Sequence, residues 1–560
     1  MRGKCLGMLL GLLLLGVGLS IPDARGGSIV EKDGKTIITV KVQQLPDPSQ
    51  DDTKSRADVE VVRKFKKEFP KIFAKKYAAK YKANPEKYGK FNWDNVEIVL
   101  ERFAGIQVEG VENDLLAIAG GMAPDLLYIN FLKSDNYIRN GFLYPLDKYF
   151  AQLTPKQIAE KVHPKIMPVC RRKGPDGKEH YWTMPFDGIL GKVLIYRKDL
   201  FEKNDVPFPD KTWTWKDLLA ACKKLTDPAK GIYGIRLGQG KHESWFWITF
   251  LWSAGGDVML YNKDKDTWKC TFDTDAAVKA LDFYTRLGAE KWTQKVDGKE
   301  KIRRGYSYKS PSQSGTKWER GQIGMMFDYI DEKLLSKIDP NNFGMAPVPI
   351  GPSGKRGGEL NSRMFGMFAE IKSEVVRDAA WEYILYYDSI PAQKIRTKVM
   401  VEGGYGKFVN KKYLKMFGYD EFIKLTPKGW NEALEMALDY GQPEPYGQNS
   451  NFAYKEMTKP IQLADQMEMA DELAPVGTQK RYEQLKKILK DGCVNANKIM
   501  IGKLSKQEKL NRRIQACFVL LAIAVAFFLV FSVFLHLLEM MVKVDRITGS
   551  SVNIDGLTCC

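Results

Sequence analysis

Histidine is scarce in this chain, with four in 560 residues. His163, His180, His242 and His536 show neither HxxxH nor HExxH spacing and form no cluster with cysteine, so the sequence predicts no metal site. A GxSxG nucleophile elbow and the kinase motifs are also missing. The sequence therefore nominates no catalytic residue, no metal ligand and no cofactor.

Cysteine is sparse too, and its eight positions do not make a disulfide scaffold in so long a chain. Four lie in the central part: Cys170, Cys222, Cys270 and Cys493. They allow one or two disulfides, and buried free thiols are the other interpretation. Cys5 stands at the start of the first apolar run and does not follow it, which argues against a lipoprotein attachment site.

Long apolar runs are limited to two. Cys5–Leu19 follows Arg2 and Lys4, which predicts a secretory signal at 1–26. Ile514–Leu538 is uncharged and, at about 1.5 Å per residue, long enough for a ~30 Å hydrocarbon core, so 514–542 is predicted as a transmembrane helix. A basic linker (506–513) precedes it and a short tail (543–560) follows. These runs predict an exported chain on the periplasmic face, anchored in the inner or plasma membrane.

The formal charge of +18 is spread over solvated helix faces, without an arginine-rich tail. Nucleic acid is therefore excluded as the expected partner. A basic surface still favours anionic ligands or membrane headgroups.

Short apolar strands alternate with amphipathic helices along the chain. The first half gives strand, helix, strand, helix and strand at Thr36–Val42, Val59–Phe73, Val96–Arg102, Leu115–Ala119 and Leu126–Ile129. Lys75–Asn95, rich in lysine and tyrosine, is interpreted as an insertion. The alternation continues to Tyr387, and the last third is mostly helical. This order predicts an α/β protein, and the roughly 480 residues between the apolar runs predict two or more lobes.

Eight segments form a collinear pattern: LLAIAGGMAPDLL, GFLYPLDKYF, YWTMPFDGILGKVLIYRKDLFEK, KTWTWKDLLAACKKL, WSAGGD with TFDTDAAVKALDFY, RGQIGMMFD, FGMAPVPIGP and DAAWEYILYYDS. Their order, from about Thr36 to Gln484, resembles the family 1 extracellular solute-binding proteins, the maltose-binding-protein-like receptors of ABC importers. Arg197 departs from the asparagine usual in that family.

The resemblance implies a two-lobed periplasmic-binding-protein (type II) fold over 27–505. Its lobes would be formed by discontinuous segments, with a crossover near 181–197 and a ligand cleft between the lobes. It also implies an importer partner made of permease and ATPase subunits. A C-terminal transmembrane helix is unusual in this family. Residues 511–542 also resemble the first helix of an importer permease, so a receptor–permease fusion fragment is an alternative.

Aromatic faces and planar polar groups recognise sugars, and in α/β lobes they lie on loops that follow strands. The candidate ligand-binding residues are Gln43, Gln44, Asn130, Phe131, Asp187, Trp252, Asp328, Tyr329, Asp331, Asn361, Arg363, Phe452 and Tyr454. Phe452 and Tyr454 are nominated by the resemblance, because relatives place an aromatic contact there. Trp252 is preferred over its neighbours Trp245 and Trp247.

Several candidates have a structural interpretation as well. Asp187 is equally suited to capping a turn, and Arg363 to a salt bridge. The aromatic candidates Phe131, Tyr329 and Phe452 can instead pack in the protein.

The sequence thus predicts a receptor, not an enzyme, that captures a small solute such as a carbohydrate or oligosaccharide by lobe closure and delivers it to an ABC importer. One alternative is a membrane-tethered sensory domain. A more remote one is a secreted glycoside hydrolase or lyase using two of the 68 acidic residues.

Overall fold

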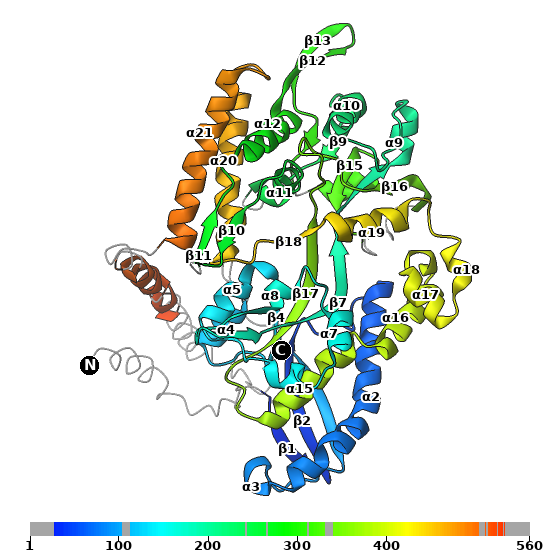
Figure 1. Cartoon of the computed structure of the whole chain (residues 1–560), viewed down its shortest axis with the longest axis vertical. Coiled ribbons are helices and arrows are strands. Elements are labelled where there is room, and N and C mark those ends of the chain that lie inside the picture. Colours follow the sequence, from blue (N-terminus) through cyan, green and yellow to red (C-terminus); the bar gives the residue numbers. More distant parts are fainter. Residues whose placement is uncertain are drawn as a thin grey trace, which may run out of the picture. The chain divides into compact units, whose positions relative to one another are not determined.

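The computed structural model describes residues 27–103, 113–240, 243–264, 267–310, 313–330, 340–502, 510, 513–523, 525–529 and 531–532. The described residues up to Met500 form one compact unit, and the described residues from Ile501 onward belong to a separate one. Two main sheets organise the first unit, and the elements packed around each sheet are called lobe 1 and lobe 2 (Figure 1).

Lobe 1 is built on a sheet to which the described residues contribute seven strands: β1 (Ile29–Lys32), β2 (Lys35–Gln43), β3 (Val96–Phe103), β4 (Leu126–Ile129), β7 (Met184–Gly191), β17 (Glu359–Met367) and β18 (Gln442–Pro443). β2 is parallel to β3 and to β4, whereas β17 is antiparallel to β4 and β7. Alternate β2 residues Ile38, Val40 and Val42 are fully buried, as expected of a strand with one face toward a core.

The helices of lobe 1 are α2 (Thr53–Lys82), α3 (Pro85–Tyr88), α4 (Asn113–Ala119), α5 (Phe131–Arg139), α6 (Asp147–Phe150), α7 (Pro155–Lys161), α8 (Met167–Cys170), α15 (Glu374–Tyr387) and α16 (Ile390–Glu402). A small hairpin adds β5 (Arg171–Lys173) and β6 (Glu179–Tyr181). α2 packs on β3, α15 and α16.

The helix expected at Val59–Phe73 does not end at Phe73, because α2 continues to Lys82, into the segment Lys75–Asn95, interpreted from sequence as an insertion. Phe73, Tyr77 and Tyr81 follow one another at four-residue intervals and are buried in the core of lobe 1. The Tyr81 hydroxyl donates to Asp378 of α15 at 2.8 Å. The lysines between these rings give the segment a polar composition. The three aromatic side chains nevertheless continue the buried face of the helix.

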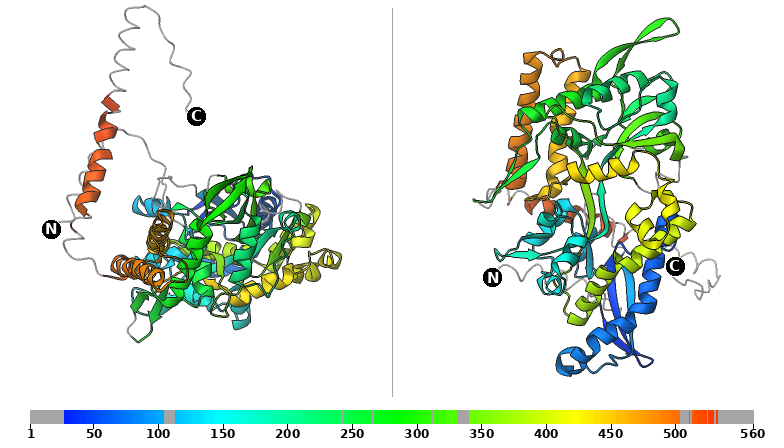
Figure 2. Two further views of the ribbon diagram at one scale, coloured as in Figure 1. Left: turned by 90° about the horizontal axis from the view of Figure 1, so that it is seen from above. Right: turned by 45° about the vertical axis from the view of Figure 1, so that its right-hand side comes forward.

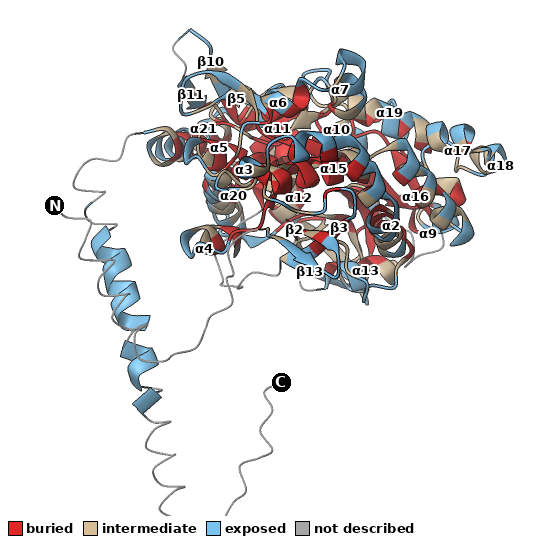
Figure 3. Ribbon diagram, turned by 90° about the horizontal axis from the view of Figure 1, so that it is seen from below, coloured by how far each residue is buried: buried red, intermediate tan, exposed pale blue. Residues whose placement is uncertain are grey.

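Lobe 2 is built on the order β14 (Ser307–Tyr308), β9 (Tyr233–Arg236), β15 (Ile323–Asp328), β8 (Val193–Arg197) and β16 (Phe343–Ala346). Its helices are α9 (Lys198–Lys203), α10 (Trp215–Leu225), α11 (Ser244–Ser253), α12 (Asp275–Ala289), α13 (Ser314–Glu319), α20 (Ala453–Met469) and α21 (Gln479–Ala496). α20 and α21 lie side by side against α12 (Figures 1 and 2). α12 and α15 are largely buried (Figure 3).

Two hairpins project from lobe 2, formed by β10 (Met259–Asn262), β11 (Thr267–Cys270), β12 (Lys291–Val296) and β13 (Lys299–Arg304). The remaining elements are η2 (Pro340–Asn342), η3 (Gly406–Phe408), α17 (Lys411–Phe417), α18 (Asp420–Ile423), α19 (Trp430–Tyr440), η4 (Ser450–Phe452) and η5 (Asn497–Ile501). α19 packs on the sheet of lobe 2, while η3 and α17 pack on α16 of lobe 1. Cys170, Cys222, Cys270 and Cys493 are buried free thiols.

The predicted signal at 1–26 lies outside the described residues. The predicted transmembrane segment 514–542 is described only up to 532 and with gaps, and its remainder also lies outside. Within the described stretches, no helix combines the length and apolar content needed to cross a membrane.

Candidate ligand site at the lobe crossover

The chain passes from lobe 1 to lobe 2 at Lys192, between β7 and β8. The Lys192 amide donates to the Glu359 carbonyl at 2.9 Å, which ties this crossing to the start of β17. Their side chains also pair: Lys192 Nζ lies 2.9 Å from Glu359 Oε2, and both side chains have no exposed surface. A buried charge is tolerated only with such a partner, so the two crossing segments are held together electrostatically.

A second buried carboxylate lies beside this ion pair. Glu444 follows β18, is 6% exposed and accepts a hydrogen bond from the Tyr454 hydroxyl at 2.9 Å. Burial, reinforced by the neighbouring negative charge of Glu359, raises the pKa of Glu444 well above its usual range. Lys192 is therefore the positive charge next to two carboxyl groups, those of Glu359 and Glu444. Glu444 takes up a proton more readily than an ordinary glutamate.

Two aromatic rings from lobe 2 complete this group. Lys192 Nζ lies 3.5 Å from the centroid of the Trp245 ring and donates to the Trp245 carbonyl at 3.2 Å. The Trp245 and Tyr329 ring centroids are 6.3 Å apart. The Tyr329 hydroxyl is buried beside Glu359 and Asn361. Burial and the charges of Glu359 and Glu444 raise the pKa of Tyr329 well above its usual value.

We call this set the crossover cluster; its members are Lys192, Trp245, Tyr329, Glu359, Asn361, Glu444 and Tyr454. Asn361 Nδ2 donates to Glu359 Oε1 at 3.5 Å. Chemically, the cluster combines aromatic faces, planar oxygen acceptors and donors in a water-poor setting. These groups suit recognition of a polar molecule that has apolar C–H faces.

Three residues nominated from sequence belong to the cluster: Tyr329, Asn361 and Tyr454. Asp328 is next to Tyr329 and forms an ion pair with Arg236 at 3.4 Å. Arg363 lies two residues beyond Asn361 on β17, with its guanidinium 5.7 Å from the Phe186 ring centroid.

The structure gives four other nominated residues local roles in lobe 1. Gln43 Oε1 accepts from the Tyr128 amide at 2.7 Å, which joins the ends of β2 and β4. Gln44 is exposed in a turn with a φ of 62°. Asn130 caps α5, and Phe131 is 1% exposed in the core.

Four other nominated residues either lie outside the set of contacts that defines the crossover cluster or have a side chain that the structure does not describe. Trp252 is 2% exposed within α11, and its Nε1 donates to Asp257 at 3.2 Å. Phe452 is 39% exposed in η4. The side chain of Asp187 and the whole of Asp331 lie outside the described residues.

Sequence reasoning missed the charged centre formed by Lys192, Glu359 and Glu444. It also preferred Trp252 to Trp245, although both lie on α11. A usable signal was present for Lys192, which is a single charge directly before the apolar residues Val193–Tyr196 and lies within the predicted crossover near 181–197.

A family model described as "Bacterial extracellular solute-binding protein" matches residues 96–394, more than half of the chain and parts of both lobes. The chain belongs to this family. Curated relatives from Brucella abortus and Brucella suis, named as binding proteins, are 24% identical over 307 residues, 54% of this chain. The match spans 66% of those relatives' length.

Solved structures of other solute-binding proteins share the fold. An ABC substrate-binding protein from Listeria monocytogenes, in complex with cycloalternan, is 18% identical with a TM-score of 0.55, covering 84% of this chain and 99% of that one. A Thermotoga lettingae protein bound to α-D-tagatose is 18% identical with a TM-score of 0.53, and the match covers 82% of this chain and 99% of that one. A Mycobacterium tuberculosis protein in complex with glycerophosphocholine is 13% identical with a TM-score of 0.54, and the match covers 82% of this chain and 98% of that one. These likenesses establish the two-lobed solute-binding protein fold.

Proposed function

We propose that this solute-binding protein captures a carbohydrate or oligosaccharide between its lobes and delivers it to an ABC importer. The observation that carries the proposal is the crossover cluster, where side chains from both lobes meet around buried carboxylates and aromatic rings. A molecule held by Tyr329 and Trp245 of lobe 2 and by Asn361 of lobe 1 would stabilise the closed arrangement of the lobes.

Several observations support a carbohydrate over other solutes. Indole and phenol rings stack on sugar C–H faces, and Asn361 and Glu359 offer planar hydrogen-bonding groups for hydroxyls. The Listeria and Thermotoga proteins were solved with sugars. The Mycobacterium protein was solved with glycerophosphocholine, so a polyol phosphodiester is the comparison ligand for the test.

The other nominated residues remain predictions for the site: Gln43, Gln44, Asn130, Phe131, Asp187, Trp252, Asp328, Asp331, Arg363 and Phe452. Of these, Arg363 and Asp328 are best supported, because each lies within two residues of a cluster member in sequence.

The test is calorimetric titration of the full chain with maltose, linear and cyclic oligosaccharides, sugar alcohols and glycerophosphocholine. We expect one carbohydrate to bind in a saturable way and Tyr329→Ala to weaken it by about tenfold or more, because the variant removes a ring and a buried hydroxyl. Tyr482→Ala is the matched control, since Tyr482 contacts Asp275 on the surface of lobe 2. Tight binding of glycerophosphocholine alone would overturn the carbohydrate assignment.

We further propose that the receptor works outside the cytoplasm, as the family description implies. Tethering by 514–542 remains a prediction, as does export by 1–26. Membrane fractionation of the full chain beside a chain ending at 505 tests the tether. A sensory role would require a different membrane partner, and uptake of the bound sugar by cells carrying the importer distinguishes transport from sensing.

A further inference from the structure

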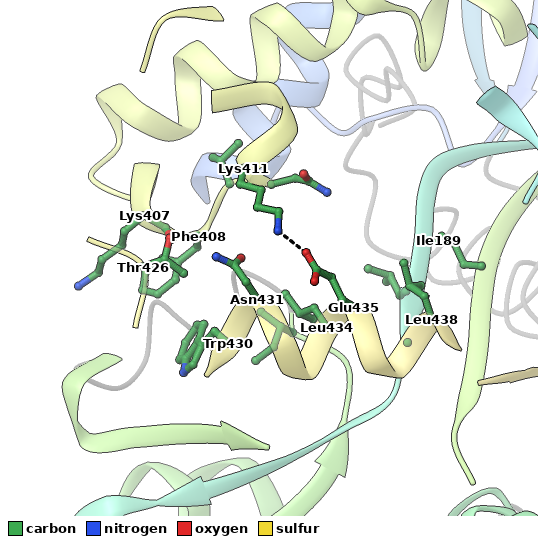
Figure 4. A pocket seen from close by; sticks show the side chains of 15 residues that line it. Ile189, Lys407, Phe408, Lys411, Thr426, Trp430, Asn431, Leu434, Glu435 and Leu438 are labelled. Carbon is green, nitrogen blue, oxygen red and sulfur yellow. Dashed lines mark hydrogen bonds and ion pairs between the residues drawn. The ribbon is translucent and has the colours of Figure 1, made fainter. Parts of the chain in front are cut away.

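A pocket separate from the crossover cluster lies between lobe 1 elements and α19. Its volume is about 260 Å³. Figure 4 shows Asn431, Leu434, Glu435 and Leu438 of α19 facing Lys411 and Ile189. This volume exceeds the ~150 Å³ that suffices for one benzene molecule in an apolar protein cavity.

The walls of the pocket come from both lobes. The end of β7, Ile189–Gly191, belongs to lobe 1, and the segment Lys407–Lys411 joins α16 of lobe 1 to Trp430, on which Phe408 stacks. α19 and Ile330 pack with lobe 2, where Trp430 is buried against Phe343 of β16. A molecule in the pocket would therefore touch both lobes without using a member of the crossover cluster.

The lining is apolar inside and charged at one edge. Its apolar side chains are Ile189, Leu190, Ile330, Phe408, Val409, Trp430, Leu434 and Leu438. Leu190 and Leu434 are 44% and 37% exposed, a large apolar surface to leave in water. The edge carries Lys407, Lys411 and Glu435, and Lys411 forms an ion pair with Glu435.

This ion pair leaves one positive charge in excess at the edge. Lys411 and Glu435 are 52% and 60% exposed, so the pair contributes little and can exchange partners. Lys407 Nζ lies 5.2 Å from the Phe408 ring centroid and, within the described residues, pairs with no carboxylate. An anion bound at this edge would meet two lysines and one glutamate.

We propose that this pocket is a second binding site, for a small amphipathic carboxylate such as a medium-chain fatty acid. The acyl chain of the fatty acid enters between Leu190, Leu434 and Leu438, and its carboxylate lies beside Lys407 and Lys411. Each additional methylene of the ligand that is removed from water strengthens binding, so affinity rises with acyl-chain length until the pocket is full.

The experiment is calorimetric titration of the full chain with octanoate, with butyrate as the short-chain comparison. We expect saturable binding of octanoate and much weaker binding of butyrate. Leu434→Arg should weaken octanoate binding by about tenfold or more, because a charged group then occupies the apolar wall. Lys407→Gln should weaken it by a few-fold.

The matched control is Leu463→Arg. Leu463 is an exposed leucine within α20, outside the pocket lining, and is 46% exposed. The Leu463→Arg protein should bind octanoate with the same affinity as the unaltered protein. Absence of saturable octanoate binding would overturn the proposal, as would equal affinities of the Leu434→Arg and Leu463→Arg proteins. Lys407→Gln changes only a surface group, so its result stands even if Leu434→Arg folds poorly.

Discussion

At the scale of single residues, the molecule concentrates its unusual chemistry where the chain changes lobes. Lys192 and Glu359 are fully buried charges, and Glu444 is a second carboxyl group next to them. Burying charge costs free energy and adds little net stability even when the charges pair. The buried charges are therefore better explained by a role in ligand recognition and in positioning the two lobes than by a contribution to stability.

Breaking the buried ion pair should be costly. Lys192→Met leaves Glu359 without its counter-charge, and we expect a loss of about 3–5 kcal/mol in the free energy of unfolding, measured with urea. The double variant Lys192→Met with Glu359→Gln should recover part of this loss, because no uncompensated charge remains. Lys35→Met serves as the control, since the Lys35–Glu97 pair is about half exposed on both sides. Equal effects of the two lysine variants would contradict the buried-pair interpretation.

Glu444 should make stability depend on pH. Its pKa is raised in the folded chain, so its contribution is fully present below about pH 4.3, the unfolded value, and is lost as pH rises toward the folded pKa. It faces Glu359, Lys192, Tyr329 and Tyr454. Glu444→Gln removes this equilibrium, so its stability relative to the unaltered chain should improve with rising pH. Urea midpoints at a series of pH values test this, and parallel profiles would argue against it.

At the scale of elements, α2 shows how a polar-looking segment becomes core. Asp378 of α15 is 2% exposed and accepts from the hydroxyls of Tyr81 and Tyr149, each at 2.8 Å. Lys80 Nζ lies 2.9 Å from the same carboxylate. Glu382 of α15 also accepts from the Tyr77 hydroxyl at 2.6 Å, so α15 holds the end of α2 through more than one carboxylate, of which Asp378 bonds the most hydroxyls.

Asp378→Ala should release this end of α2. Two buried tyrosine hydroxyls lose their acceptor, and we expect a loss of about 2–5 kcal/mol in the free energy of unfolding. Hydrogen exchange should speed up in the last turns of α2. Asp94→Ala is the control, because Asp94 pairs with Lys82 on the surface. Unchanged exchange in α2 would contradict the role given to Asp378 and leave packing and the Glu374 and Glu382 contacts to hold the helix end.

Strands were the best-predicted elements because their apolar runs are short and sharply bounded. The strand expected at Leu126–Ile129 has those bounds, and the strand expected at Val96–Arg102 is extended by one residue in β3. α2 was expected to end at Phe73 and continues to Lys82, because aromatic spacing outweighs the lysines around it.

For the whole molecule, family motifs predicted the two-lobed fold, whereas only part of the site was accessible from sequence. Tyr329 and Asn361, nominated because loops and strand ends favour ligand contacts, both belong to the crossover cluster, and their role in ligand binding stays a prediction. Lys192, Glu359 and Glu444 were missed, since their burial depends on three distant chain segments meeting. Composition describes them only as charged residues.

The most direct test of the receptor assignment is the melting temperature of the full chain across a panel of mono- and oligosaccharides. A ligand that binds only the folded chain adds about 2.7 kcal/mol at 100 times its Kd. The account predicts a saturable rise with at least one carbohydrate, which is recovered chemically unchanged. No rise with any carbohydrate, or conversion of the sugar into product, would contradict it.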